Sequence, residues 1–227
     1  MINVDKQVEE LFAAGAHLGH KANRVHPKTN KYIYSFENGV SIIDLTKTVD
    51  YLEKAKQFVS ALGKNEKVLL VISTKKIASN LTQELCQKNN LPFINTKWPA
   101  GLLTNFEQTS RNIKKLKDLR SKRENNEFAD RTKKEILLID RKIAKLTRFY
   151  GGVEELQKMP DAVFVIDVRR EENACYEANR MSVPVVAICD TNADLSLVNY
   201  PIPGNDDAIK AIEIVTNAVA DAYREGR

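Results

Sequence analysis

The sequence predicts an α/β fold in which helices cover a mainly parallel sheet. Residues 162–167 (AVFVID) and 184–189 (PVVAIC) are short, nearly continuous apolar runs, which are typical of strands buried on both faces of a parallel sheet. Between them, Ala174, Ala178 and Met181 recur at spacings of four and three, which predicts the connecting helix. Because such crossovers are almost always right-handed, this one β-α-β unit predicts a layered α/β domain.

The elements before this unit follow from the same two periodicities. Apolar residues on one face predict helices over residues 4–13, 46–62 and 77–88, with Gly63 just past the end of the second. Apolar or alternating runs predict strands over residues 32–36, 40–43, 68–72 and 93–95. Asn38-Gly39 predicts a tight turn between the first two of these strands.

The C-terminal part of the chain predicts one more helix. Two prolines keep residues 199–207 extended. Asn205 is expected to cap the following helix, and Asp206 and Asp207 in its first turn suit the helix dipole. The helix runs to about Tyr223. Its predicted core-facing residues are Ile209, Ile212, Val215, Ala218 and Val219.

Residues 106–150 predict an inserted hairpin of two antiparallel helices. A capping box, Thr104-x-x-Glu107, opens the first helix. The second covers residues 131–150, and Gly151-Gly152 ends it. One narrow apolar stripe on each helix predicts a coiled-coil contact. The stripe residues are Ile113, Leu116 and either Leu119 or Arg120 on the first helix, and Ile136, Ile139, Ile143, Leu146 and Tyr150 on the second. The predicted organisation is an α/β domain of residues 1–105 and 151–227 with this hairpin inserted.

The positive charge of the chain is concentrated in the predicted hairpin. The whole chain carries 35 Lys or Arg and 30 Asp or Glu. Residues 106–150 hold 14 of these bases and 7 of the acids, a net charge of +7, which leaves 21 bases and 23 acids elsewhere. Self-repulsion of this kind is relieved by an anionic partner. The distribution therefore predicts a surface that faces a polyanion.

Acidic residues at the predicted strand ends offer a different hypothesis. Carboxyl ends of parallel strands are where such folds bind ligands, and carboxylates suit a hard cation. The candidates for a metal-dependent enzyme are Asp167, Asp190, Asp194 and Asp206, and His17-x-x-His20 offers two further ligands for a structural magnesium or zinc ion. Asp is also a common turn and capping residue, so a purely structural role competes with this hypothesis.

Several classes of protein are disfavoured by what the sequence lacks. No GxGxxG or GxxxxGK[ST] motif occurs, which argues against a nucleotide-binding enzyme. The three cysteines are isolated and odd in number, which fits a reducing cytoplasm rather than a disulfide framework. No apolar run approaches the roughly 20 residues that span a bilayer. The first residues, MINVDKQVEELF, lack the pattern of a secretory signal.

Segments along nearly the whole chain resemble the bacterial small-subunit ribosomal protein S-two family. They include AGAHLGHKANRVHPKTNKYIY, NGVSIIDLTKT, STKK, FYGGVEEL and, most specifically, YPIPGNDDAI. The resemblance implies a flavodoxin-like domain with an inserted hairpin, a structural and non-catalytic role at the head-body junction of the small ribosomal subunit, and no small-molecule substrate. It also implies contacts with ribosomal RNA and neighbouring proteins, and help in docking the messenger-binding ribosomal protein S-one.

The residues expected to contact RNA phosphates are basic side chains in two regions. Those on the hairpin are Arg111, Lys114, Lys115, Lys122, Arg141, Lys142, Lys145 and Arg148. Those in the rest of the chain are Lys21, Arg24, Lys28, Lys31, Lys75, Lys76 and Lys97. Trp98 beside Lys97 has two interpretations, a base-stacking ring or a buried anchor.

Overall fold

A five-stranded parallel sheet forms the centre of the protein in a computed structural model that describes residues 4–227. Its strands are β4 (Leu69–Ile72), β5 (Phe93–Ile94), β6 (Ala162–Ile166), β7 (Val185–Cys189) and β8 (Tyr200–Pro203). They lie in the order β5-β4-β6-β7-β8, and every pair is parallel. The predicted parallel α/β fold is confirmed, and its architecture is consistent with a Rossmann-like fold.

Helices cover both faces of this sheet. Helices α2 (Leu45–Lys64), α3 (Lys76–Lys88) and α7 (Ile209–Gly226) pack on one face, and α6 (Glu172–Arg180) packs on the other. The strands are apolar on both sides for this reason. In β4, Leu69 and Val71 belong to the first core, whereas Leu70 and Ile72 belong to the second.

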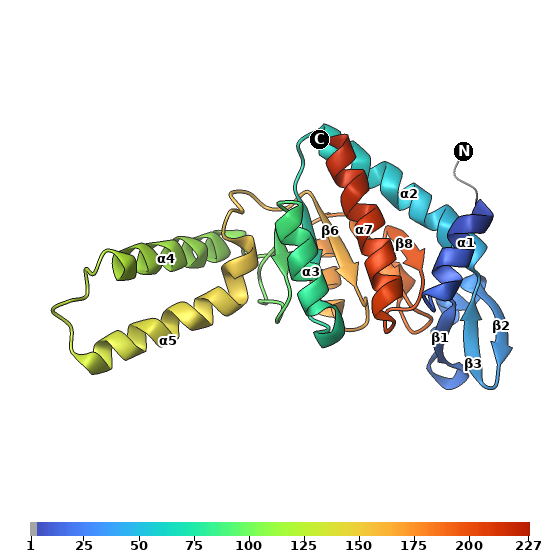
Figure 1. The fold of residues 1–227 in the computed structure, drawn as a ribbon, viewed down its shortest axis with the longest axis horizontal. Helices are drawn as coiled ribbons and strands as arrows, with labels where there is room; N and C mark the ends of the chain where they lie inside the picture. Colours follow the sequence, from blue (N-terminus) through green and yellow to red (C-terminus); the bar gives the residue numbers. More distant parts are fainter. Residues whose placement is uncertain (1–3) are drawn as a thin grey trace.

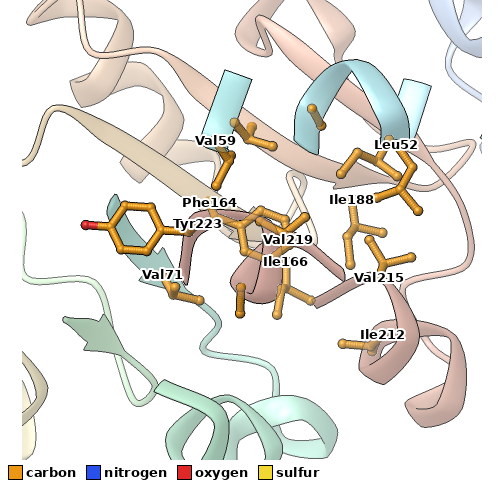
Figure 2. Close-up of a cluster of buried hydrophobic side chains, with 14 of the residues drawn as sticks. Leu52, Val59, Val71, Phe164, Ile166, Ile188, Ile212, Val215, Val219 and Tyr223 are labelled. Carbon is orange, nitrogen blue, oxygen red and sulfur yellow. The ribbon is translucent and has the colours of Figure 1, made fainter. Parts of the chain in front are cut away.

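The larger of the two cores lies between the sheet and the α2–α7 pair. Phe164 and Ile166 of β6 meet Val215 and Val219 of α7 there (Figure 2). Phe164 is only 1% exposed, and removing such a ring typically costs about 3–5 kcal/mol of stability. Gly63 lies inside α2 rather than just past its end. A Cβ at Gly63 would collide with the backbone of α7, so glycine permits the close crossing of the two helices.

The first 43 residues add a helix and a small antiparallel sheet at one end of the domain. Helix α1 (Val4–Ala13) has the predicted bounds, and β2 (Ile33–Glu37) and β3 (Val40–Ile43) correspond to the predicted strands. Asn38 and Gly39 both have positive φ (48° and 78°), as a two-residue hairpin turn requires. The prediction missed β1 (Leu18–Lys21), which completes the order β1-β3-β2. Residues 1–3 of the predicted first domain lie outside the described part of the chain.

The chain after β7 differs from the prediction in three ways. β8 is a strand despite Pro201 and Pro203, because it pairs with β7 at the edge of the sheet. The predicted cap of the last helix is wrong: α7 begins at Ile209 after Ala208, with no side-chain cap, and the Asn205 amide donates to the Gly15 carbonyl instead. Ile209 is 51% exposed rather than buried.

Two antiparallel helices, α4 (Phe106–Glu124) and α5 (Lys133–Tyr150), project away from the sheet (Figure 1). Their direction follows from contacts between residues 112 and 150, 120 and 147, and 123 and 140. Ile113 and Leu116 of α4 are buried, whereas none of the α5 residues is. The apolar residues predicted on α5 are half-buried and line its inner side. We call α4 and α5 together the hairpin.

The N-terminal caps of α4 and α5 differ from the prediction. The predicted capping box at Thr104 and Glu107 is wrong, because α4 starts after Asn105 without a side-chain cap and both Thr104 donors point to Glu177. A complete capping box does occur at Thr132 and Glu135, before α5.

Shorter turns complete the chain. Four 3-10 helices cover Ala22–Arg24, Pro27–Tyr32, Gly151–Val153 and Leu195–Leu197. Within residues 4–227, no helix combines the length and the apolar character that crossing a membrane requires.

Candidate functional site

Acidic side chains gather at the carboxyl edge of the parallel sheet, around one lysine. Lys75 follows β4, and its Nζ lies 3.2 Å from Asp167 after β6. The same Nζ lies 2.6 Å from Asp206 and 2.7 Å from Asp207, which follow β8. Lys75 is 13% exposed and Asp206 2%. We call Lys75, Asp167, Asp206 and Asp207 the strand-edge cluster.

The protonation of this cluster follows from burial and mutual contact. Burial alone would lower the pKa of Lys75, but the carboxylates of Asp206, Asp207 and Asp167 outweigh it and raise that pKa, so the ammonium stays charged. Burial and the neighbouring carboxylates of Asp167 and Asp190 raise the pKa of Asp206. One ammonium among three carboxyl groups leaves the cluster with a net negative charge, so Lys75 has no charge left for an external phosphate.

His20 of β1 joins a second acidic group beside this cluster. Its Nδ1 lies 3.0 Å from Asp190, and its Nε2 lies 3.9 Å from Asp207. The hydrogen bond to Asp190 raises the pKa of His20 above its ordinary value, despite partial burial. One ligand atom from each of His20, Asp190 and Asp207 falls within 4.8 Å of the others. One imidazole and two carboxylates are donors that suit a divalent cation.

The other predicted metal ligands are placed elsewhere. His17 stacks on Phe12 with a 4.2 Å centroid separation, so the His17-x-x-His20 pair does not converge. Asp194 pairs with Lys28 at 3.1 Å and accepts from the Ser196 backbone N–H. These contacts, that of Ser196 first, lower the pKa of Asp194 to about 2. Asp206 is held by Lys75. Asp207 was not among the predicted metal ligands, because it was expected in the first turn of the last helix. That helix begins only at Ile209.

The small antiparallel sheet is fixed to the strand edge by buried hydroxyl groups. Thr191 Oγ1 accepts from the His20 backbone N–H at 2.9 Å and lies 3.0 Å from Ser41 Oγ. Gly19 makes this approach possible, because a Cβ there would collide with both hydroxyl side chains. The edge where Rossmann-like folds bind ligands is thus covered by the protein's own N-terminal part.

Basic side chains on the hairpin fall into two groups. Five of them form ion pairs with acids: Arg111, Lys117, Arg120, Arg123 and Arg131. Nine others form no ion pair with any described residue: Lys114, Lys115, Lys122, Lys133, Lys134, Arg141, Lys142, Lys145 and Arg148. All nine are exposed. We call these nine residues the unpaired hairpin cations.

The unpaired hairpin cations include seven of the eight that the sequence analysis named. Arg111 is the exception, because Glu107 one turn earlier neutralises it. The ammonium of Lys115, on the facing helix, lowers the pKa of Lys142. Two like charges held this close have unfavourable mutual energy that an anion between them removes.

The predicted cations outside the hairpin are scattered over the surface. Lys21, Arg24, Lys76 and Lys97 are exposed and form no ion pair with a described residue. Lys28 is committed to Asp194, and the Lys31 ammonium lies 4.9 Å from the centre of the Tyr32 ring. Trp98 is 8% exposed and donates from Nε1 to Glu177, which makes it a buried anchor rather than a free stacking ring.

Comparisons with known proteins match this chain along nearly its whole length. The family model described as Ribosomal protein S2 matches residues 11–226. Small ribosomal subunit protein uS2 of Coprothermobacter proteolyticus is 41% identical over 220 residues, which cover 97% of this chain and 82% of that protein. The uS2 proteins of Mycobacteroides abscessus and Nocardia farcinica are each 40% identical over 219 residues, which cover 96% of this chain and 79% and 77% of theirs. With these matches over the fold described above, the chain belongs to the ribosomal protein S2 family.

Proposed function

We propose that this protein is a structural component of the small ribosomal subunit in translation, held on ribosomal RNA mainly by its hairpin. The observation that carries the proposal is the set of nine exposed hairpin cations without an ion-pair partner among the described residues, in a segment with a net charge of +7. Phosphates of an RNA backbone are the polyanion that such a surface fits, because each contact releases condensed counterions. Family membership supports a cytoplasmic, ribosome-bound protein.

The architecture within this proposal is a flavodoxin-like domain with an inserted coiled coil. Numbered within the sheet, the strand order is 2-1-3-4-5, the flavodoxin-like order. Residues 1–105 and 151–227 then form one domain, and residues 106–150 form the insertion. Alternating three- and four-residue spacings of apolar residues on α5 support the coiled-coil contact.

Cations outside the hairpin extend the proposed RNA surface. Lys21, Arg24, Lys31, Lys76 and Lys97 belong to it, whereas Lys28 and Lys75 no longer do, because Asp194 and the carboxylates of the strand-edge cluster match their charges. We place this surface at the junction of the head and body of the subunit, as the family resemblance implies. Phosphate contacts position a protein on RNA rather than read its sequence.

An apolar surface on the N-terminal part suits a protein partner, and we assign it to the docking of ribosomal protein S-one. Five of the large exposed apolar residues of the described chain lie between residues 4 and 36: Val4, Phe12, Leu18, Tyr34 and Phe36. Tyr34 is 77% exposed, the highest of these. Exposed apolar groups of this kind mark interaction surfaces, and the large exposed apolar residues of the hairpin, Leu137 and Leu138, include no aromatic ring.

Sedimentation of a native cell lysate tests the RNA part of the proposal. The protein is expected to travel with small subunits at low salt and to be released at high salt. If about six phosphates are engaged, RNA affinity falls by roughly a thousandfold or more between low and moderate salt. A protein that stays in the soluble fraction under both conditions would contradict the proposal.

Substitution of two exposed aromatic residues tests the docking part. The double variant Tyr34→Ser, Phe36→Ser should still join small subunits but recruit less S-one, measured by immunoblot of the purified subunits. Tyr176→Ser is a matched control, because Tyr176 is also exposed (53%) but lies on α6. Normal S-one content in the double variant would remove this surface from the proposal.

The alternative of a metal-dependent enzyme loses its support. The family is one of ribosomal proteins rather than enzymes, and Lys75 already occupies the centre of the strand-end carboxylates. A magnesium or zinc ion at His20, Asp190 and Asp207 would hold the N-terminal sheet against the strand edge, a structural task. Metal analysis of the purified protein, compared with the His20→Gln variant, checks for such an ion.

A further inference from the structure

The loop of residues 98–104, from which the hairpin departs, is held by a single carboxylate of a different element. Glu177 lies on α6, and its Oε1 accepts from Trp98 Nε1 at 2.9 Å and from the Gly101 backbone N–H at 2.8 Å. Its Oε2 accepts from the backbone N–H groups of Leu103 (3.2 Å) and Thr104 (3.3 Å), and from the Thr104 hydroxyl (3.3 Å). One side chain therefore accepts five hydrogen bonds from one loop.

Among the described residues, no other side chain accepts a hydrogen bond from the backbone N–H groups of this loop. The N–H groups of Gly101, Leu103 and Thr104 have Glu177 as their partner, and α4 begins after Asn105 without a side-chain cap. Gly101 has a φ of +86°, so the loop backbone is bent to aim its donors. Burial alone would raise the pKa of Glu177, but the hydrogen bonds from Gly101, Trp98, Thr104 and Leu103 outweigh it and lower that pKa.

We infer that Glu177 is a positioning residue for RNA binding: it fixes the direction of the hairpin relative to the sheet, although it lies outside the cationic surface. This inference rests on the function proposed above. Helix α4 has 19 residues, a length of about 28 Å, so a rotation of about 10° at its base moves the tip by about 5 Å. That displacement is comparable to the spacing of neighbouring phosphates, so an orientation error misaligns several cations at once.

The C-terminal end of α5, at the base of the hairpin, is anchored to the region of β5. The Thr96 hydroxyl donates to the Arg148 carbonyl at 2.6 Å, and Gly152 lies so close to Phe93 that a Cβ there would collide with it. Lys117 and Arg120 pair with Glu155 and Glu154 just beyond α5. The ion pairs of Lys117 and Arg120 hold the middle of α4, so loss of Glu177 loosens α4 only where it leaves the loop, and the predicted motion is a limited swing of the hairpin.

Spin-label distances test the inference without RNA. Labels at Ala129→Cys beside the hairpin tip and Asn217→Cys on α7 both sit on exposed positions, and Cys86, Cys175 and Cys189 are buried. With Glu177 intact, double electron–electron resonance is expected to give one narrow distribution of the distance between the two labels. Glu177→Ala should broaden or shift it, and Glu177→Gln, which keeps one acceptor oxygen, should give an intermediate result. A distribution unchanged in both variants overturns the inference.

Binding to small-subunit ribosomal RNA gives the second measurement. Glu177→Ala should bind this RNA about 10- to 100-fold more weakly than the unmodified chain. The affinity of Glu177→Gln should lie between those two values. Glu172→Ala is the matched control, because it removes the same charge from an exposed position on the same helix and should change nothing. The magnitude of the slope of log affinity against log salt should fall as well in Glu177→Ala, because misaligned cations no longer neutralise phosphates, and Glu177→Gln should restore part of it.

The outcomes separate this inference from the proposed function. Weaker binding and a changed distance distribution support both. A changed distribution with no RNA binding by any variant, the unmodified chain included, supports the positioning role and contradicts the proposed function. Wild-type affinity in Glu177→Ala overturns the positioning role while the proposed function stands. If Glu177→Ala fails to fold, as thermal unfolding would show, the Glu177→Gln distances and affinity decide.

Discussion

Lys75 and Lys142 carry the same side chain in opposite surroundings. Their comparison shows two different uses of positive charge in this protein. Lys75 is 13% exposed and lies within 3.2 Å of three carboxylates, so its charge is used to hold strand ends together. Lys142 is exposed, has no acidic partner among the described residues, and faces another lysine. Charge matched inside the fold serves stability, whereas charge left unmatched on a projecting hairpin is available for a partner.

The largest expected effect is on stability, from a change in the strand-edge cluster. Lys75→Met leaves the buried Asp206 and its neighbours without their cation, and such a loss typically costs about 3–5 kcal/mol. Urea unfolding monitored by circular dichroism measures the cost. Lys142→Met serves as the control and should change stability by no more than about 0.5 kcal/mol. Equal losses in the two variants would mean that the two surroundings do not differ as described.

The next effect is on RNA affinity, from a change in the hairpin. The triple variant Lys115→Ala, Lys142→Ala, Lys145→Ala removes three unpaired hairpin cations. If each engages one phosphate, the salt slope of RNA binding should fall by about two to three units, with unfolding by urea unchanged. A control triple variant of cations that are paired, such as Lys117, Arg120 and Arg123, should lower stability more and the slope less. Filter binding over a salt series gives both slopes.

The smallest expected effect is a pH dependence confined to the start of α5. Hydrogen bonds from the Thr132 backbone and side chain lower the pKa of Glu135 below its ordinary 4.5. A lowered folded-state pKa means that the stabilisation is present above about pH 4.5 and is lost as pH falls through the folded-state value. The protection of the Glu135 and Ile136 amides, which is their exchange rate relative to the intrinsic rate at each pH, should therefore fall below pH 4. Thr132→Ala should show that lower protection already at neutral pH. Equal exchange in both proteins at neutral pH would rule out the capping box.

Much of the fold was predictable because its signals are local. The strands of residues 162–166 and 185–189 are continuous apolar runs, and the Asn38-Gly39 turn is specified by its two residues. Strands β1 and β8 were missed for a physical reason. β1 is short and polar and pairs only because Gly19 fits against Thr191, and β8 carries two prolines that only an edge position tolerates.

The candidate site was less predictable because its residues are joined by tertiary contacts. Charge counting found seven of the unpaired hairpin cations, but it could not separate Arg111, which Glu107 neutralises, from Lys114. It could not separate Lys75 from Lys76 either, since only the position after β4 brings Lys75 to three aspartates. Glu177 gave no signal at all, because its partners are backbone donors more than 70 residues away.

Lysine modification, compared between the free protein and assembled small subunits, shows whether RNA covers the unpaired hairpin cations. A brief reaction with an amine-specific acetylating reagent, followed by mass spectrometry, reports each lysine separately. We expect Lys114, Lys115, Lys122, Lys142 and Lys145 to react in the free protein and to be protected in the subunit, while Lys75 stays unreactive in both. Hairpin lysines that react equally in both states would contradict the claim that unmatched charge on the hairpin binds RNA.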